Sequence, residues 1–211
     1  MTSPRKAFTL IELLVVIAII SILSLIATVN LLESTIRAKV ARTAAQLRTL
    51  TGALETYHVD NNAYLYFLRG GSGSLVNRVI VPMSLRLRPL TTPIPYISTV
   101  PIDVFETVAT SDGSPLTFFD TYDYADVASF EMLHNPKGAG ATSGGMWRLS
   151  SVGPDRIQSF GGDIAEIGHD SIINTFGVDY DPTNGSISAG DIVRVGPPSS
   201  VGQLPAIRRA G

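Results

Sequence analysis

The apolar residues near the N-terminus form one long stretch. Residues 1–7 include the basic pair Arg5 and Lys6, whereas residues 8–32 are predominantly apolar and contain Glu12 as their only charge. A helix rises about 1.5 Å per residue, so this stretch would measure roughly 37 Å and could cross a hydrocarbon core of about 30 Å. Because basic residues precede the stretch, we predict a single membrane span with its N-terminus in the cytoplasm.

The pattern then becomes amphipathic. From residue 32 to residue 57, apolar side chains recur every three or four positions, as on one face of an α-helix; they are Leu32, Ile36, Val40, Ala44, Leu47, Leu50, Leu54 and Tyr57. Strict heptads are not sustained, which argues against a free-standing coiled coil. We therefore predict one continuous helix over residues 9–58, about 75 Å long, that ends at the turn-forming residues 60–62. Its second half is expected to pack against a globular domain.

Three segments of the remaining chain have β-strand character. Residues 117–124 are rich in aromatic side chains, residues 146–152 alternate apolar and polar positions, and residues 191–195 are rich in β-branched side chains. They predict a small antiparallel sheet lying across the amphipathic half of the helix, an α+β fold. Tyr122 and Trp147 are expected in its core, although an aromatic platform for sugar binding is an alternative.

Three further segments are less regular. Residues 76–90 fit either a strand or a short helix, and the prolines within residues 90–102 predict an extended loop. The glycine- and serine-rich residues 70–74 predict a flexible loop.

The composition excludes several classes of function. The 211 residues carry a formal net charge of −2, which argues against nucleic-acid binding, and the lack of cysteine excludes disulfides and thiolate metal sites. The three histidines lie in unrelated contexts, and there is neither a phosphate-binding loop nor a nucleophile elbow. We expect the protein not to be an enzyme.

Glu12 distinguishes the apolar stretch from simpler targeting segments. An ordinary signal peptide has an apolar run of about 7–15 residues, shorter than the one here. A plain membrane anchor would leave Glu12 unexplained, because a carboxylate in the bilayer costs several kcal/mol and usually marks function. Snorkelling of its side chain to the lipid headgroups is the remaining structural alternative.

The sequence KAFTLIE at residues 6–12 resembles the class III signal of type IV prepilins and type II secretion pseudopilins. The resemblance implies that a prepilin peptidase cuts between Ala7 and Phe8, that the new amine of Phe8 is methylated, and that the apolar helix is retained. Glu12 matches the family's glutamate, whose carboxylate would pair with the Phe8 amine of a neighbouring subunit. The departures are Ala7, where the family usually has glycine, and the lack of proline in the apolar helix.

Two later segments also resemble major pseudopilins. Residues 57–64 are similar to the family's YxxDNxxYP segment without its proline, and residues 147–155 resemble its W-x-L-x-S-x-G-P-D strand and turn, which precedes a calcium-binding loop. In this chain the oxygen ligands expected to suit Ca²⁺ are Asp179, Asp181, Asn184 and Asp191. The alternative is a set of tight turns that needs no metal.

The resemblance implies a pilin fold and a division into four parts: a leader peptide (1–7), a membrane and fibre-core helix (8–32), its amphipathic continuation (33–60) and an exported β-rich domain (61–211). The protein would reside in the bacterial inner membrane with this domain in the periplasm. It would assemble into a pilus or pseudopilus with copies of itself, other pseudopilins, prepilin peptidase and an inner-membrane platform. The alternative function is that of a minor pilin that binds or adheres to a surface.

Overall fold

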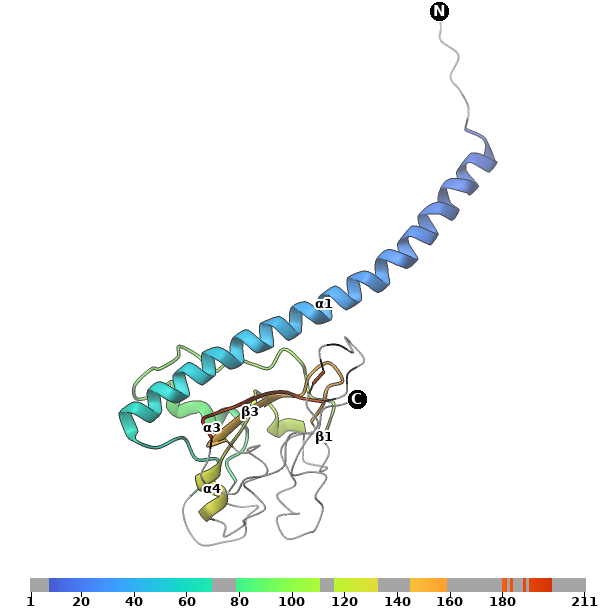
Figure 1. Ribbon diagram of the computed structural model, residues 1–211. Coiled ribbons are helices and arrows are strands. Elements are labelled where there is room, and N and C mark those ends of the chain that lie inside the picture. The colour runs from blue at the N-terminus through green and yellow to red at the C-terminus, as the bar shows by residue number, and fades with distance from the viewer. Residues whose placement is uncertain are drawn as a thin grey trace, which may run out of the picture.

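One long helix dominates the computed structural model, which describes residues 8–69, 79–110, 116–132, 145–158, 180, 181, 183, 188 and 190–198. Helix α1, Leu10–Asn61, projects from the globular domain with its N-terminal half and lies across that domain with its C-terminal half (Figure 1). It ends at Asn62, whose left-handed backbone (φ 52°) lets its N–H donate to the His58 carbonyl at 2.8 Å. The predicted continuous helix is confirmed, and its end lies three residues beyond the predicted one.

A three-stranded antiparallel sheet faces the C-terminal half of α1. Its strands are β2 (Asp123–Asp126), β3 (Trp147–Ser151) and β5 (Ile192–Val195), in the order β2-β3-β5. A separate parallel pair joins β1 (Ala109–Thr110) to β4 (Ile157–Gln158). The predicted α+β fold is thus confirmed. The strands predicted over residues 146–152 and 191–195 are correct for most of their length.

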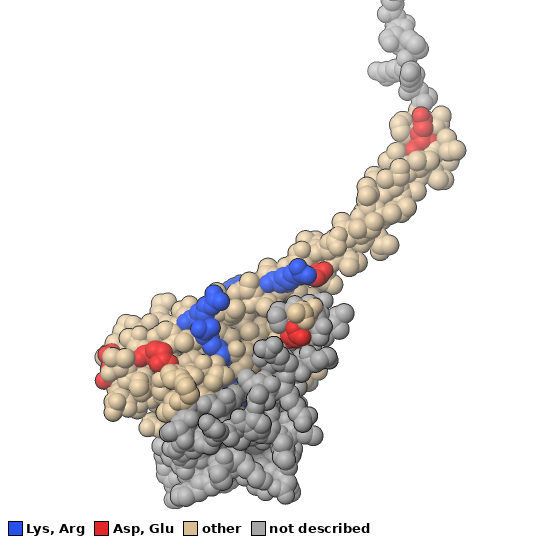
Figure 2. Space-filling view, viewed as in Figure 1, with Lys and Arg blue, Asp and Glu red and all other residues tan. Residues whose placement is uncertain are grey.

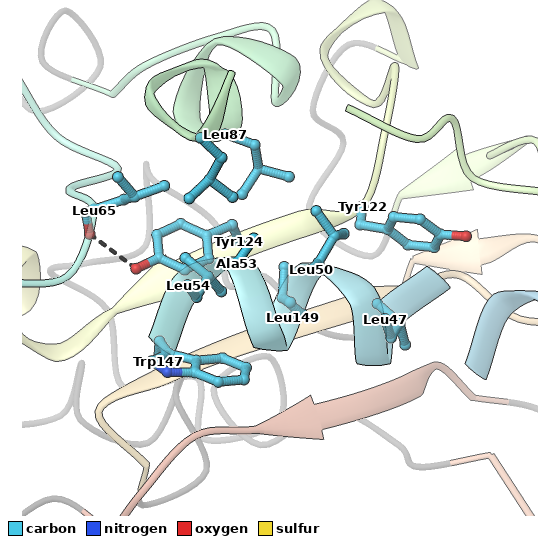
Figure 3. Packing of buried hydrophobic residues seen from close by; sticks show 11 residues of the cluster. Leu47, Leu50, Ala53, Leu54, Leu65, Leu87, Tyr122, Tyr124, Trp147 and Leu149 are labelled. Carbon is cyan, nitrogen blue, oxygen red and sulfur yellow. Dashed lines mark hydrogen bonds between the residues drawn. The ribbon is translucent and has the colours of Figure 1, made fainter. Parts of the chain in front are cut away.

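The amphipathic stripe of α1 forms the core together with this sheet. Leu47, Leu50 and Leu54 are at most 1% exposed and pack with Tyr124 and Leu149 (Figure 3). The Tyr124 hydroxyl donates to the carbonyl of Leu65 at 2.9 Å, so the chain that follows α1 is also attached to the sheet (Figure 3). Thr43 is the first fully buried residue of α1. Leu32, the first residue of the predicted stripe, is 64% exposed.

Tyr122 and Trp147 have the core positions predicted for them, since both are fully buried. The Trp147 indole donates to Glu55 Oε1 at 3.0 Å, which ties β3 to α1. The adjacent strand β5 is tied to the same helix, because Arg194 Nε donates to the Thr51 hydroxyl at 3.1 Å. These bonds fix the direction in which the helix crosses the sheet.

The strand predicted over residues 117–124 is wrong for its first part. The short 3₁₀ helix η2, Leu116–Phe118, occupies this part, and β2 starts only at Asp123. The reason is a tertiary contact: the Phe118 carbonyl accepts the Met83 N–H at 2.9 Å, and Asp120 Oδ1 accepts the Ser84 N–H at 2.9 Å. These bonds attach residues 116–120 to the helix that begins at Ser84 and so keep them out of the sheet.

Residues 76–90, which fit either a strand or a short helix, are helical from Ser84 onward, whereas Val79 forms an isolated antiparallel bridge with Leu68. They contain α3 (Ser84–Leu87) and the 3₁₀ helix η1 (Arg88–Leu90), whereas residues 91–102 form no helix or strand, as their prolines predict. Helix α4, Val127–Met132, follows β2. The predicted flexible loop at residues 70–74 lies outside the described residues.

A buried ionic network joins α3 to the sheet. Arg86 Nη1 donates to Asp123 Oδ1 at 2.8 Å and to the Tyr124 carbonyl at 2.9 Å, while Arg148 bonds the other oxygen of Asp123. All three charged side chains are at most 6% exposed. Because removal of one partner leaves an uncompensated buried charge, breaking such a pair typically costs about 3–5 kcal/mol.

Asp126 is a second buried carboxylate, at the end of β2. Its Oδ1 accepts the Phe67 N–H at 3.0 Å and the Ser129 hydroxyl at 2.7 Å, and its Oδ2 accepts the Ser129 N–H at 2.8 Å. These donors favour the ionised form, but desolvation outweighs them and raises the pKa of Asp126 from 3.8 to about 6.

This raised pKa predicts a pH-dependent stability. The folded state binds the Asp126 proton more tightly than the unfolded chain, so the contribution is present below about pH 4 and is lost as the pH rises through about 6. We expect wild type to gain about 2 kcal/mol of unfolding free energy over Asp126→Asn between about pH 7.5 and pH 4. Urea titrations followed by the fluorescence of Trp147 would measure it, with the exposed Asp120→Asn as control. A constant difference, or one that grows with rising pH, would contradict this assignment.

Candidate functional site

The N-terminal half of α1 has an apolar surface on all sides. Every residue from 8 to 32 is exposed, including Leu10 (80%), Leu25 (71%) and Phe8 (71%). Figure 2 shows this segment extending away from the domain with almost no charged side chain. Among the described residues, α1 is the one helix long and apolar enough to cross a membrane. A contiguous apolar surface of this size requires lipid or protein around it.

Two hydroxyl groups inside this segment are satisfied within the helix. The hydroxyls of Ser21 and Thr28 each donate to the carbonyl four residues earlier, at 2.7 Å, on Ile17 and Ser24. Backbone groups of a helix are likewise paired internally, so the backbone of the segment can lie in hydrocarbon. Glu12, the one charged residue of the segment, needs a separate explanation.

Glu12 closes a capping box at the start of α1. The Glu12 N–H donates to the hydroxyl of the N-cap residue Thr9 at 3.3 Å, and Glu12 Oε2 accepts the Thr9 N–H at 2.8 Å and the Thr9 hydroxyl at 2.6 Å. The two residues thus satisfy donors that a helix start otherwise leaves unpaired. Both donated bonds end on Oε2, and Oε1 takes part in neither.

Thr9 is a functional candidate that the sequence analysis did not identify. The signal for it is present in the sequence, because Thr9 and Glu12 have the T-x-x-E spacing of a capping box directly before an apolar run. Phe8 is the first described residue, and Ala7, on the other side of the predicted cleavage point, lies outside the described residues.

Comparison with known families identifies this end of the chain. Residues 2–28 match the model of the prokaryotic N-terminal methylation motif, a range that includes Phe8, Thr9 and Glu12. The chain carries a prepilin-type N-terminal methylation motif. The motif is consistent with a type IV pilin-like protein. Searches of curated proteins and of solved structures returned no match to the chain.

The loop expected to bind calcium is described only in part, because Asp179 and Asn184 lie outside the described residues. Its two ends meet where the Tyr180 N–H donates to the Asp191 carbonyl at 2.8 Å. Asp181 Oδ1 accepts the N–H and the hydroxyl of Thr183, at 2.8 and 2.7 Å, which is ordinary turn chemistry. The side chain of Asp191 is fully buried.

The strand-and-turn segment at residues 147–155 contacts this loop. Gly153 has a φ of 71°, and a Cβ there would meet the Gly190 carbonyl oxygen at 2.4 Å, so the close approach requires glycine. Asp155 Oδ2 accepts the Gly190 N–H at 2.9 Å. Within the described residues there is no group of three or more His, Asp or Glu side chains that could hold a metal ion. Calcium binding therefore stays a prediction.

Calcium binding can be tested by thermal unfolding of the full-length protein in detergent. If Asp179, Asp181, Asn184 and Asp191 hold the ion, Ca²⁺ at about 100 times its Kd should stabilise the folded state by about 2.7 kcal/mol and raise the melting temperature. Asp179→Ala or Asp181→Ala should abolish this rise, whereas Asp120→Ala, in a different loop, should leave it unchanged. A melting temperature that does not respond to Ca²⁺ or to a chelator would remove the prediction.

The capping box predicts a local effect of Thr9. Replacement by valine removes the hydroxyl, and loss of an N-cap typically costs about 1 kcal/mol, so the amides of the first turn of α1 should exchange about fivefold faster. Hydrogen–deuterium exchange of the full-length protein in nanodiscs would measure this rate. Thr28→Val is the matched control, since its hydroxyl bonds only a carbonyl within the helix. Equal exchange in both variants would show that the box does not hold the helix start.

Proposed function

We propose that the protein is a structural subunit of a pilus or of a pseudopilus of the type II secretion kind. Prepilin peptidase cuts it between Ala7 and Phe8, and copies then polymerise through residues 8–32. The observation that carries the proposal is the contrast along α1: its first half is exposed and apolar on all sides, whereas its second half packs on the domain core.

The exposed apolar segment explains where the subunit resides before and after assembly. It spans the inner membrane once, with Arg5 and Lys6 in the cytoplasm and the domain in the periplasm. In the fibre the same segment packs against copies of itself, so its surroundings remain apolar. An assembly platform and other pseudopilins are the expected partners in this transfer.

Glu12 supplies the selectivity that apolar packing lacks. Lipid tails are as apolar as the helix, so burial alone does not favour one alignment of two helices over another. A carboxylate and an amine in a medium of low dielectric constant attract strongly, and either one left unpaired is costly. A neighbour docked with its Phe8 amine beside Glu12 is thus favoured over one that is displaced along the axis.

The capping box is compatible with this pairing because both of its residues remain after cleavage. Thr9 engages Oε2 of Glu12, and we propose that the methylated Phe8 amine of the adjacent subunit bonds Oε1. One carboxylate then holds its own helix start and the neighbouring chain at the same time.

Substitutions of Glu12 test this proposal in the assembling system. Glu12→Val and Glu12→Ala should insert into the membrane normally but lose fibres, which electron microscopy and shearing assays would count. Glu12→Gln can still accept hydrogen bonds from Thr9 but has no charge, so it should lose fibres too if the ion pair is required. Glu33→Gln, which changes an acidic residue of the same helix outside residues 8–32, is the matched control. Normal fibre yield from the valine variant would contradict the proposed role.

The processing step has its own test. Mass spectrometry of the N-terminal peptide from the membrane fraction should identify a chain that begins at N-methylated Phe8. A mature protein that lacks residues 8–32 would exclude polymerisation through this segment. Fibres formed when the subunit is expressed alone would indicate a major subunit, whereas a low copy number confined to fibre tips would indicate a surface-binding minor pilin.

A further inference from the structure

Exposed basic side chains surround α1 just beyond its apolar segment. Arg37, Lys39 and Arg42 are all exposed, and Glu33 is the one acidic residue in residues 33–42. Glu33 pairs with Arg37 at 2.5 Å, but the two side chains are 45% and 71% exposed, and such pairs are worth little. These three cations, here called the basic belt, give this stretch a net positive charge. Basic side chains are visible along this part of the helix in Figure 2.

The belt lies just beyond the lipid headgroups when residues 8–32 span a membrane, where its long side chains can reach back to them. With Glu12 at the cytoplasmic boundary, about 30 Å of helix brings Leu32 to the opposite boundary of the hydrocarbon core. Arg37 and Lys39 then lie about 8 and 10 Å further on, and Arg42 about 15 Å. The headgroup layer is about 5–8 Å thick on each side, and long cationic side chains can reach back toward it.

The directions of the three side chains favour a lipid layer over a protein partner. At about 100° per residue, Lys39 and Arg42 are rotated roughly 200° and 140° from Arg37, so the cations are spread around the helix. A protein docks on one side of a helix, whereas a headgroup layer surrounds it. Arg48 is on nearly the same side as Arg37, but it lies about 24 Å beyond Leu32 and is too far from the layer.

The globular domain reaches the same level. Lys39 Nζ lies 5.9 Å from the ring centroid of Phe105, which belongs to the loop before β1. The adjacent Glu106, an acidic group at this edge, is paired with Arg156 at 2.8 Å. The domain therefore begins near the level of Lys39, about 10 Å beyond Leu32, and limits how deeply the helix can enter.

We propose that Arg37, Lys39 and Arg42 bind anionic phospholipid headgroups on the periplasmic side of the inner membrane. In membrane proteins, basic residues near a span are usually enriched on its cytoplasmic side. Binding to anionic headgroups would explain why three basic residues follow this span on its periplasmic side. The contact fixes how deeply the subunit lies in the membrane before assembly. It therefore also fixes the depth in the membrane at which Glu12 meets a neighbouring subunit. The proposal rests on the membrane insertion proposed above.

The test uses the full-length protein in nanodiscs that contain equal amounts of phosphatidylcholine and phosphatidylglycerol. Native mass spectrometry then counts the lipids that remain bound. Wild type should retain phosphatidylglycerol preferentially, and the triple variant Arg37→Gln, Lys39→Gln, Arg42→Gln should lose about fivefold of that preference per cation removed. Arg48→Gln is the matched control on the same helix and should retain it. Arg5 and Lys6 contribute an equal background in every variant.

The outcomes separate this proposal from the one on which it rests. A protein that does not enter nanodiscs would contradict membrane insertion itself. A protein that enters them, but keeps its lipid preference without the belt, would overturn this proposal alone. An equal loss in Arg48→Gln would also overturn it, since the charge would then act at long range. Unchanged lipid binding together with loss of fibres in the triple variant would overturn the proposal as well, because it would indicate that the belt contacts another subunit.

Discussion

The structure depends on one helix that has to be stable in two surroundings. An α-helix satisfies its backbone hydrogen bonds internally, so α1 can continue from a protein core into hydrocarbon without exposing polar groups. The side chains alone decide which surroundings each half requires. The change occurs between Leu32, which is largely exposed, and Leu47, which is buried against the sheet. In the described part of the domain, the main apolar cluster is arranged around the buried half.

The domain core shows why the helix cannot be separated from the sheet. Leu50 and Leu54 fill the space above Tyr124 and Leu149, so removal of α1 would expose the inner face of β2 and β3. Polar contacts reinforce this packing at two strands, through Glu55 with the Trp147 indole and Thr51 with Arg194. A force applied to the N-terminal half of α1 would therefore be transmitted directly to the domain.

Local patterns in the sequence predict the parts of the fold that local physics determines. The period of α1, the alternation in β3 and the turn residues after His58 are sufficient for these elements. The strand predicted at residues 117–120 is wrong because Phe118 and Asp120 bond residues near the start of α3, which are distant in the chain. The network of Arg86, Asp123 and Arg148 is equally invisible in the sequence, since its members are separated by 25 or more residues.

The candidate sites also differ in how far the sequence predicts them. The methylation motif is contiguous and can be read directly, and the T-x-x-E spacing of Thr9 and Glu12 is also readable. The calcium loop is different, because its proposed ligands are spread over residues 179–191 and their arrangement depends on how the loop closes. The contacts described there are the one between Tyr180 and Asp191, the turn bonds between Asp181 and Thr183, and the support from Asp155.

Strand β5 has a further consequence for the proposed fibre subunit, which would have to form only one kind of polymer. In the described sheet it is an edge strand, and an unprotected edge can pair with another sheet and start an amyloid-like aggregate. This edge is four residues long, carries the exposed cation Arg194, and is followed by Pro197 and Pro198. Short length, charge and proline each discourage such pairing. Subunits crowded together in a membrane would thus remain free to associate through their helices alone.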